Sequence, residues 1–141
     1  MSNEQTINTA RALIEAINRR DMSLWERATA DDLVADYPGA HALDKEAARM
    51  FNLSFFDAAP DLHFDVENVI AQGDTVVFQI TTSGTFTRPL VTPAETIPPT
   101  GKQVNAPMVL IAQVRDGKVV REQTVWNQLE VFKQLGILPE K

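Results

Sequence analysis

The first part of the chain carries apolar residues at the three- and four-residue spacing that places them on one face of a helix. The first such stripe consists of Ile7, Ala10, Leu13, Ile14 and Ile17. It predicts a helix over residues 3–19, and a second short helix is expected around residues 24–30, carrying Trp25. A third stripe predicts a helix over residues 45–58, which Pro60 ends because proline lacks the amide proton that a helix needs.

After Pro60 the spacing changes from helical to alternating, the pattern of a strand with one buried face. Here Leu62, Phe64 and Val66 alternate with His63, Asp65 and Glu67. Three further strands are expected where β-branched residues are frequent, at residues 75–86, 103–115 and 118–126. The first two strands meet at Gly73-Asp74 and the last two at Asp116-Gly117, a dipeptide typical of tight hairpins.

Turn and capping signals define the remaining segments. Residues 89–100 contain four prolines, which cannot donate hydrogen bonds to a central strand, so a long loop beside the sheet is expected. Ser2 and Gln5 can form a capping box for the first helix. A closing amphipathic helix is expected to end at Gly136, shortly before Pro139.

The order of these elements, helices first and then hairpin-connected strands, predicts an α+β fold rather than alternating βα units. With no linker or internal repeat, residues 1–141 are expected to form one domain. Helices that cover one face of a strongly curved sheet leave a hollow, which side chains or a ligand must fill. The expected ligand is therefore a small molecule.

Composition narrows the range of partners and compartments. The 141 residues include no cysteine, which excludes disulfides and fits a reducing cytoplasm. The first residues show neither a signal peptide nor a membrane anchor. A formal net charge of -6, with scattered basic residues, disfavours nucleic acids and anionic membranes as partners.

Three segments carry a resemblance to a known family, and together they cover most of the chain in the expected order. They are AINRRDMSLWERATADDLVADYPG, PDLHFDVENVIAQGDTVVFQI and VRDGKVVREQTVWNQLEVFKQLGILP. The chain resembles the SnoaL-like polyketide cyclases of the nuclear-transport-factor-2-like superfamily. The resemblance implies a cone-shaped, cystatin-like fold with helices on a curved antiparallel sheet, a homodimer through the outer sheet face, and no metal or organic cofactor.

The resemblance also implies a chemistry, intramolecular aldol closure of polyketide esters, with hydroxylases, isomerases and epoxide hydrolases among the relatives. These cyclases use an Asp eight residues ahead of a Leu-Gly pair as acid and base, and Asn127 stands at that place here. A carboxamide cannot transfer the proton, so Asn127 is expected to position the substrate instead. Arg121, Gln123 and Val125 share the face of Asn127 on an alternating strand and match the family's interior positions. Alternatively, Arg121 and Gln123 pair with each other or with a helix carboxylate.

Another group must then move protons if the protein is an enzyme. His63 and His41 are candidates because the unperturbed pKa of histidine lies near neutrality, and the alternative for each is an ordinary surface side chain. Related ketosteroid isomerases place a catalytic Asp immediately before a Pro, where this chain has Tyr37. Asp36, one residue earlier, is a further candidate for proton transfer, as a buried carboxyl with a raised pKa. It would point to the opposite face of an extended segment, unless the segment slips by one residue. Tyr37 is expected to hydrogen-bond a ligand.

Large apolar side chains on inward stripes are candidates for the cavity wall, namely Trp25, Phe51, Phe55, Phe78 and Met108. The same stripes would pack a solid core, and periodicity does not separate the two cases. Glu122 and Glu130 are expected to be surface charges. The sequence thus predicts a cofactor-independent enzyme acting on a small apolar carbonyl compound, or alternatively a non-catalytic binding module of the same fold.

Overall fold

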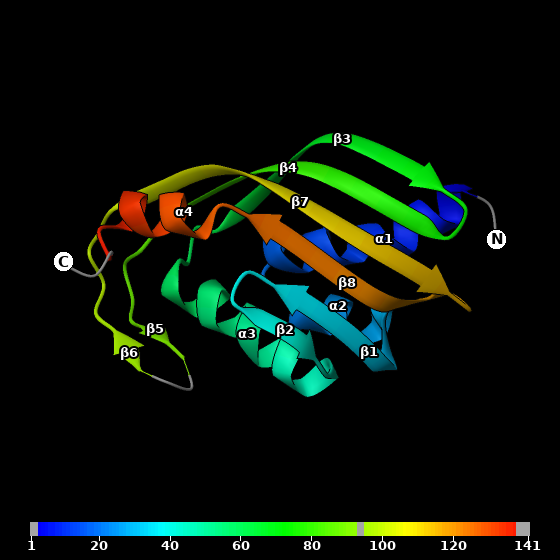
Figure 1. Cartoon of the computed structure of the whole chain (residues 1–141), viewed down its shortest axis with the longest axis horizontal. Coiled ribbons are helices and arrows are strands. Elements are labelled where there is room, and N and C mark those ends of the chain that lie inside the picture. Colours follow the sequence, from blue (N-terminus) through cyan, green and yellow to red (C-terminus); the bar gives the residue numbers. More distant parts are fainter. Residues whose placement is uncertain (1–2, 93–94, 138–141) are drawn as a thin grey trace.

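The computed structural model describes residues 3–92 and 95–137 (Figure 1). The helices are α1 (Asn3–Asn18), α2 (Met22–Ala28), α3 (Lys45–Ala58) and α4 (Gln128–Leu135). The strands are β1 (Thr29–Tyr37), β2 (Ala40–Leu43), β3 (His63–Gln72), β4 (Thr75–Thr85), β5 (Leu90–Val91), β6 (Thr96–Ile97), β7 (Gln103–Arg115) and β8 (Lys118–Trp126). Ser2 and Pro139 lie outside the described residues, so the capping box and the proline stop stay predictions.

Six strands form one curved sheet in the order β2-β1-β8-β7-β4-β3. The long pairs β3–β4, β4–β7 and β7–β8 are antiparallel, as expected from the two hairpin turns. Strand β1 departs from this pattern and runs parallel to β8. The α+β fold with helices on a curved sheet is therefore confirmed, with one parallel pair near its edge.

The sequence analysis did not predict strands β1 and β2, since it placed every strand after Pro60. The segment after α2 nevertheless alternates: Leu33, Ala35 and Tyr37 are at most 3% exposed. The intervening Asp32, Val34 and Asp36 are more exposed, which is the burial pattern of a strand with one face on the core. The acidic residues at the start of β1 masked this short alternation.

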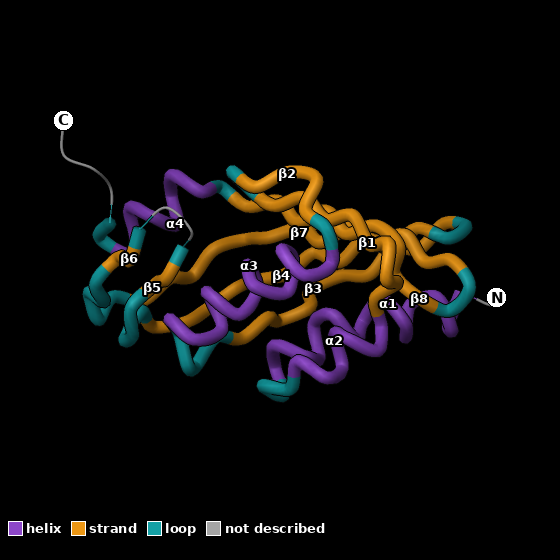
Figure 2. The backbone as a smooth tube through the Cα atoms, turned by 90° about the horizontal axis from the view of Figure 1, so that it is seen from below, coloured by secondary structure: helices purple, strands orange, loops and turns teal. Residues whose placement is uncertain are grey.

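Helices α1, α2 and α3 lie along one face of the sheet, and Figure 2 shows this layering from below. Helix α1 contacts β3, β4, β7 and β8, whereas α3 contacts β1, β2 and β5. The core between these layers is tightly enclosed, since Trp25, Leu33, Val76 and Phe78 are at most 2% exposed. Burial of each such side chain stabilises the fold by roughly 1.5 to 3 kcal/mol before entropy is counted.

Side-chain and backbone caps set the helix ends. Asp44 Oδ1 accepts a hydrogen bond from the Ala47 amide at 2.9 Å and begins α3. Helix α4 ends at Gly136, whose left-handed backbone (φ of 73°) favours glycine because a side chain there is strained. The ends predicted for these two helices from Pro60 and Gly136 agree with the structure.

The proline-containing segment 89–100 is expected to be a loop, but it includes the short antiparallel pair of β5 and β6. This pair is separate from the main sheet. Its Leu90 is 3% exposed and packs in an apolar cluster with Phe86, Val104 and Leu135. Within the described residues no helix is both long and apolar enough to cross a membrane.

Candidate functional site

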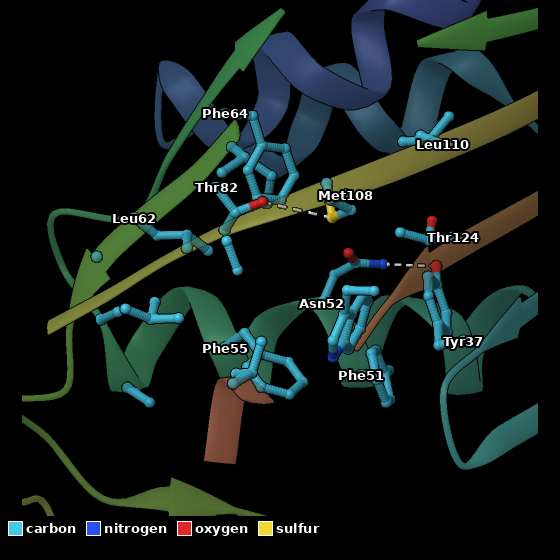
Figure 3. Close-up of a pocket in the computed structure, with 18 of the residues that line it drawn as sticks. Tyr37, Phe51, Asn52, Phe55, Leu62, Phe64, Thr82, Met108, Leu110 and Thr124 are labelled. Atoms are coloured by element: carbon cyan, nitrogen blue, oxygen red, sulfur yellow. Dashed lines mark hydrogen bonds between the residues drawn. The ribbon is translucent and has the colours of Figure 1, made fainter. Parts of the chain in front are cut away.

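A cavity of about 100 Å³ lies between the helices and the inner face of the sheet. Figure 3 shows its wall, to which α3 contributes from one side and β4 and β7 from the other. Most of the lining side chains are apolar. Such a space, with few polar groups in an apolar wall, is the usual form of a small-molecule site.

Four aromatic rings form one side of the cavity. Tyr37 and Phe51 are stacked, with ring centroids 4.3 Å apart and planes inclined by 3°. Phe55 lies edge-on to Trp126, at a centroid distance of 6.0 Å, and both rings also contact Phe51. These contacts hold the rings in place, so a ligand would meet a preformed aromatic surface.

Two hydrogen bonds join side chains that line the cavity (Figure 3). Asn52 Nδ2 donates to Tyr37 Oη at 2.9 Å and also to the Ala48 carbonyl at 2.9 Å. On the opposite wall, the Thr82 hydroxyl lies 3.5 Å from Met108 Sδ. Asn52 and Tyr37 thus place polar atoms beside an otherwise apolar volume.

Glu122 supplies a carboxyl group to the same wall and is 3% exposed. Its Oε2 accepts a hydrogen bond from the Thr124 hydroxyl at 3.2 Å. Neither Oε1 of Glu122 nor Nε1 of Trp25 has a described partner at hydrogen-bonding distance and angle, although both Trp25 and Tyr37 lie near enough to stabilise the charged carboxylate. Glu122 is therefore a buried acid with few partners.

Burial controls the ionisation of both Glu122 and Tyr37. Removal from water raises the pKa of Glu122, and its hydrogen-bonding neighbours oppose this only in part. Burial also raises the pKa of Tyr37 well above its usual value, and the adjacent Glu122 charge raises it further. Tyr37 consequently keeps its proton near neutral pH, whereas the carboxyl of Glu122 is shifted toward the range useful for proton transfer.

Comparison with known proteins now identifies the family. The profile of the SnoaL-like polyketide cyclases matches residues 7–135. This chain belongs to the SnoaL-like polyketide cyclase family. A search of curated protein sequences finds no significant match.

Solved structures agree with this SnoaL-like assignment. AclR from Streptomyces galilaeus, provisionally assigned as a hydroxylase, is 25% identical, with a TM-score of 0.82 over 98% of this chain and 100% of that chain. A provisionally assigned SnoaL-like polyketide cyclase from Jannaschia sp. CCS1 is 25% identical, with a TM-score of 0.85 over 97% and 95% of the two chains. IdmH from Streptomyces antibioticus, provisionally a polyketide cyclase, is 26% identical, with a TM-score of 0.77 over 94% and 99%.

Asn127 is not among the residues that line the cavity, contrary to the inward orientation expected from the sequence, and a role in positioning substrate stays a prediction. Asn127 is exposed and caps α4, where its Oδ1 accepts a hydrogen bond from the Glu130 amide at 3.1 Å. An Asn side chain at this position satisfies an amide that the helix leaves without an internal partner. Asn127 therefore has a structural role at the end of β8.

The inner and outer faces of β8 are also the reverse of those expected. Arg121, Gln123 and Val125 are exposed, so they do not line the cavity. The pairing of β8 with β7 shifts register at this point, since Gln113 pairs with Arg121 but Val114 pairs with Val119. The extra residue in β8 is a bulge, which reverses the alternation beyond it.

The other proposed proton-transfer groups lie outside the cavity wall. Asp36 bonds Arg121 at 2.6 Å and lies 3.8 Å from His41 Nδ1, on the strand face opposite to Tyr37. This pairing agrees with the expected opposite orientation of Asp36 and Tyr37. His63 is half-exposed and lies 3.4 Å from Asp65 on the same strand, β3. None of these residues is among those lining the cavity.

Several apolar candidates do lie in the cavity wall, namely Trp25, Tyr37, Phe51, Phe55 and Met108. Phe78 is not among the lining residues and packs in the core instead, with the Arg11 guanidinium 5.7 Å from its ring. That the lining residues bind substrate stays a prediction.

The sequence analysis missed Asn52 and placed Glu122 on the surface. Asn52 could have been found as a polar residue four positions after Ala48 on the apolar stripe of α3. Glu122 could have been found by its two-residue spacing from Thr124 and Trp126. Among the described residues, no group of three or more His, Asp or Glu side chains is placed to hold a metal ion.

Proposed function

We propose that this protein catalyses proton transfer and ring closure of a small, mostly apolar carbonyl compound, with Glu122 as the group that moves the proton. The observation that carries the proposal is a buried carboxyl group with a raised pKa in the wall of an apolar cavity. Membership of the SnoaL-like polyketide cyclase family supports this class of chemistry. The specific substrate, homodimer, cytoplasmic location and cofactor independence stay predictions.

The proposed reaction needs one base that becomes an acid. The Glu122 carboxylate takes a proton from a carbon that lies between two carbonyl groups, leaving an enolate. The enolate carbon then forms a bond to a second carbonyl carbon of the same molecule, and the electron pair of that C=O bond moves to its oxygen. Glu122 returns the proton to this alkoxide, so the product is an isomer of the substrate.

Glu122 fits this cycle better than the other ionisable groups near the cavity. A carboxylic acid whose pKa is raised toward neutrality can both accept and donate a proton near the operating pH. The raised pKa of Tyr37 makes it a hydrogen-bond donor rather than a base. Tyr37 therefore suits stabilisation of a carbonyl oxygen or of the Glu122 carboxylate, while the aromatic rings hold the carbon skeleton.

A second candidate, a non-catalytic binding module, is supported by one specific feature. Oε1 of Glu122 is enclosed by protein atoms and has essentially no exposed surface. If that enclosure persists when a ligand binds, the carboxyl cannot reach a substrate carbon. Proton exchange distinguishes this candidate from the enzyme, because binding alone leaves the ligand's C–H bonds intact.

The experiment measures deuterium incorporation in D2O, by NMR, into a panel of cyclic 1,3-diketones and aryl 1,3-diketones. The wild-type protein is expected to accelerate exchange at the carbon between the carbonyls for at least one compound. Glu122→Gln should reduce that acceleration by about 100-fold or more, because general acid–base catalysis contributes roughly 10²- to 10⁴-fold.

Asp36→Asn is the matched control, since it removes a carboxylate from the opposite strand face and is expected to leave exchange within about threefold of wild type. Equal acceleration by wild type and Glu122→Gln would exclude Glu122 as the base. Binding of a diketone without accelerated exchange would favour the binding module.

A further inference from the structure

The amide group of Asn52 has a fixed orientation in the cavity wall. Its Nδ2 donates hydrogen bonds to the Ala48 carbonyl and to Tyr37 Oη, each at 2.9 Å. A carbonyl oxygen only accepts, so the nitrogen and not the oxygen of the amide must face Ala48. Both amide protons are thereby used, and the oxygen is directed elsewhere.

Oδ1 of Asn52 accepts no hydrogen bond within the part of the chain that the structure describes. Figure 3 shows this oxygen turned away from Tyr37 and toward Met108 across the cavity. The nearby Thr82 hydroxyl is directed at Met108 Sδ and the Thr124 hydroxyl at Glu122. The cavity therefore presents a carbonyl acceptor that the protein leaves unpaired, which disfavours filling the space with a wholly apolar ligand.

We propose that Oδ1 of Asn52 accepts a hydrogen bond from a ligand hydroxyl group, and that the cavity selects neutral, hydroxylated ring compounds. This inference deepens the proposed function and rests on it only in placing the ligand in the same cavity. Tyr37, Phe51, Phe55 and Trp126 supply the flat apolar surface for the ring.

Charge in the wall explains the selection of neutral compounds. None of the described residues lining the cavity is Lys, Arg or His, and Glu122 is an acid. An anionic ligand would lose its hydration without gaining a cationic partner, and it would lie near the Glu122 carboxyl. A phenol or an enol supplies the hydrogen-bond donor without carrying that charge.

The test compares 1-naphthol with 1-methylnaphthalene by isothermal titration calorimetry of the wild-type protein. The two compounds have nearly the same shape, and the methyl compound is the more apolar. Without a specific acceptor the methyl compound would bind at least as tightly. We expect 1-naphthol to bind about tenfold more tightly or better, and 1-naphthoate to bind at least about tenfold more weakly than 1-naphthol.

Asn52→Leu keeps a side chain of similar size but removes the acceptor, and it should abolish the preference for the hydroxyl compound. Ser54→Ala, two residues further along α3 and away from the cavity, is the matched control and should retain the preference. If Asn52→Leu does not fold, Asn52→Ala, which also removes the acceptor, replaces it in the same comparison. Equal or tighter binding of 1-methylnaphthalene, or no binding of 1-naphthol, would overturn the inference.

The outcome is separable from that of the proposed function. A hydroxyl preference that depends on Asn52, without Glu122-dependent exchange, would leave the inference standing and exclude the catalytic role. Glu122-dependent exchange without a hydroxyl preference would support the catalytic role and overturn the inference about Asn52.

Discussion

The two faces of β8 place chemically similar residues in opposite surroundings. On the outer face, Arg121 bonds Asp36 at 2.6 Å, and the Arg121 side chain is half-exposed. On the inner face, Glu122 is 3% exposed and lacks a cationic partner among its described neighbours. A partly exposed ion pair contributes little to stability, whereas a buried carboxyl without a cationic partner is disfavoured as an ion.

Position on the sheet, and not residue type, separates the ion-paired carboxylate of Asp36 from the buried carboxyl of Glu122. Glu122 and Asp36 lie on neighbouring strands. The pKa of Glu122 is raised chiefly by desolvation, which depends on the helices that cover the inner face. Substitutions on either face test this contrast.

The largest difference in stability is expected between adjacent residues on the two faces. Trp126→Ala should lower the free energy of unfolding by about 3 kcal/mol, because it removes a ring packed against Phe51 and Phe55. Val125→Ala should change it by less than about 0.5 kcal/mol, since Val125 is 50% exposed. Urea unfolding of both variants measures this, and similar losses would contradict the assigned faces.

The next prediction concerns pH. The folded carboxyl of Glu122 keeps its proton to a higher pH than the unfolded one, so its contribution to stability is present at low pH and is lost as pH rises through the folded pKa. The Glu122→Gln variant has no carboxyl group that titrates at this position. The free energy of unfolding of this variant, relative to that of wild type, should therefore rise with pH above about 4.3. The rise should be about 1.4 kcal/mol per pH unit at most, until the pKa of the folded Glu122 carboxyl is passed.

Urea titrations between pH 4 and pH 8 measure this stability difference. The matched substitution on the outer face, Asp36→Asn, should cost less than about 1 kcal/mol at neutral pH, because Arg121 is half-exposed. A pH-independent difference between wild type and Glu122→Gln would mean that burial does not shift Glu122.

The smallest effect is expected at the end of β8. Asn127→Ala should cost about 1 kcal/mol, because it removes the cap that accepts from the Glu130 amide. Asn127→Asp should keep that stability, since Asp is an equally good cap, and should not create proton-transfer activity from an exposed position. If the Asn127→Asp variant gained deuterium exchange that does not depend on Glu122, position 127 would have the catalytic role expected from the family resemblance.

Much of the fold could be predicted from local signals. The helical stripe of Ile7 to Ile17, the stop at Pro60 and the Asp116-Gly117 turn each specify structure within a few residues. Strand β1 was missed because its partner β8 is about ninety positions away in the chain, as in the pairing of Thr29 with Val119. Its short alternation is a weak signal without that partner.

The candidate site was predicted less well, and for a related reason. Trp25, Phe51 and Phe55 were found because large apolar residues on a helix stripe point inward wherever the helix packs. The polar residues were misplaced because alternation says which residues share a face but not which face is inside. The bulge after Val119 then exchanged the faces of β8.

Short-range periodicity, turn chemistry and motif order were enough to predict the helices, the two long hairpins, the α+β class and the family. Only the assembled fold shows that Glu122 is enclosed, that Asn127 caps a helix, and that Asn52 presents an unpaired oxygen to the cavity. Burial and hydrogen-bond pairing depend on strands and helices far apart in the chain, and no local pattern encodes which of them come together.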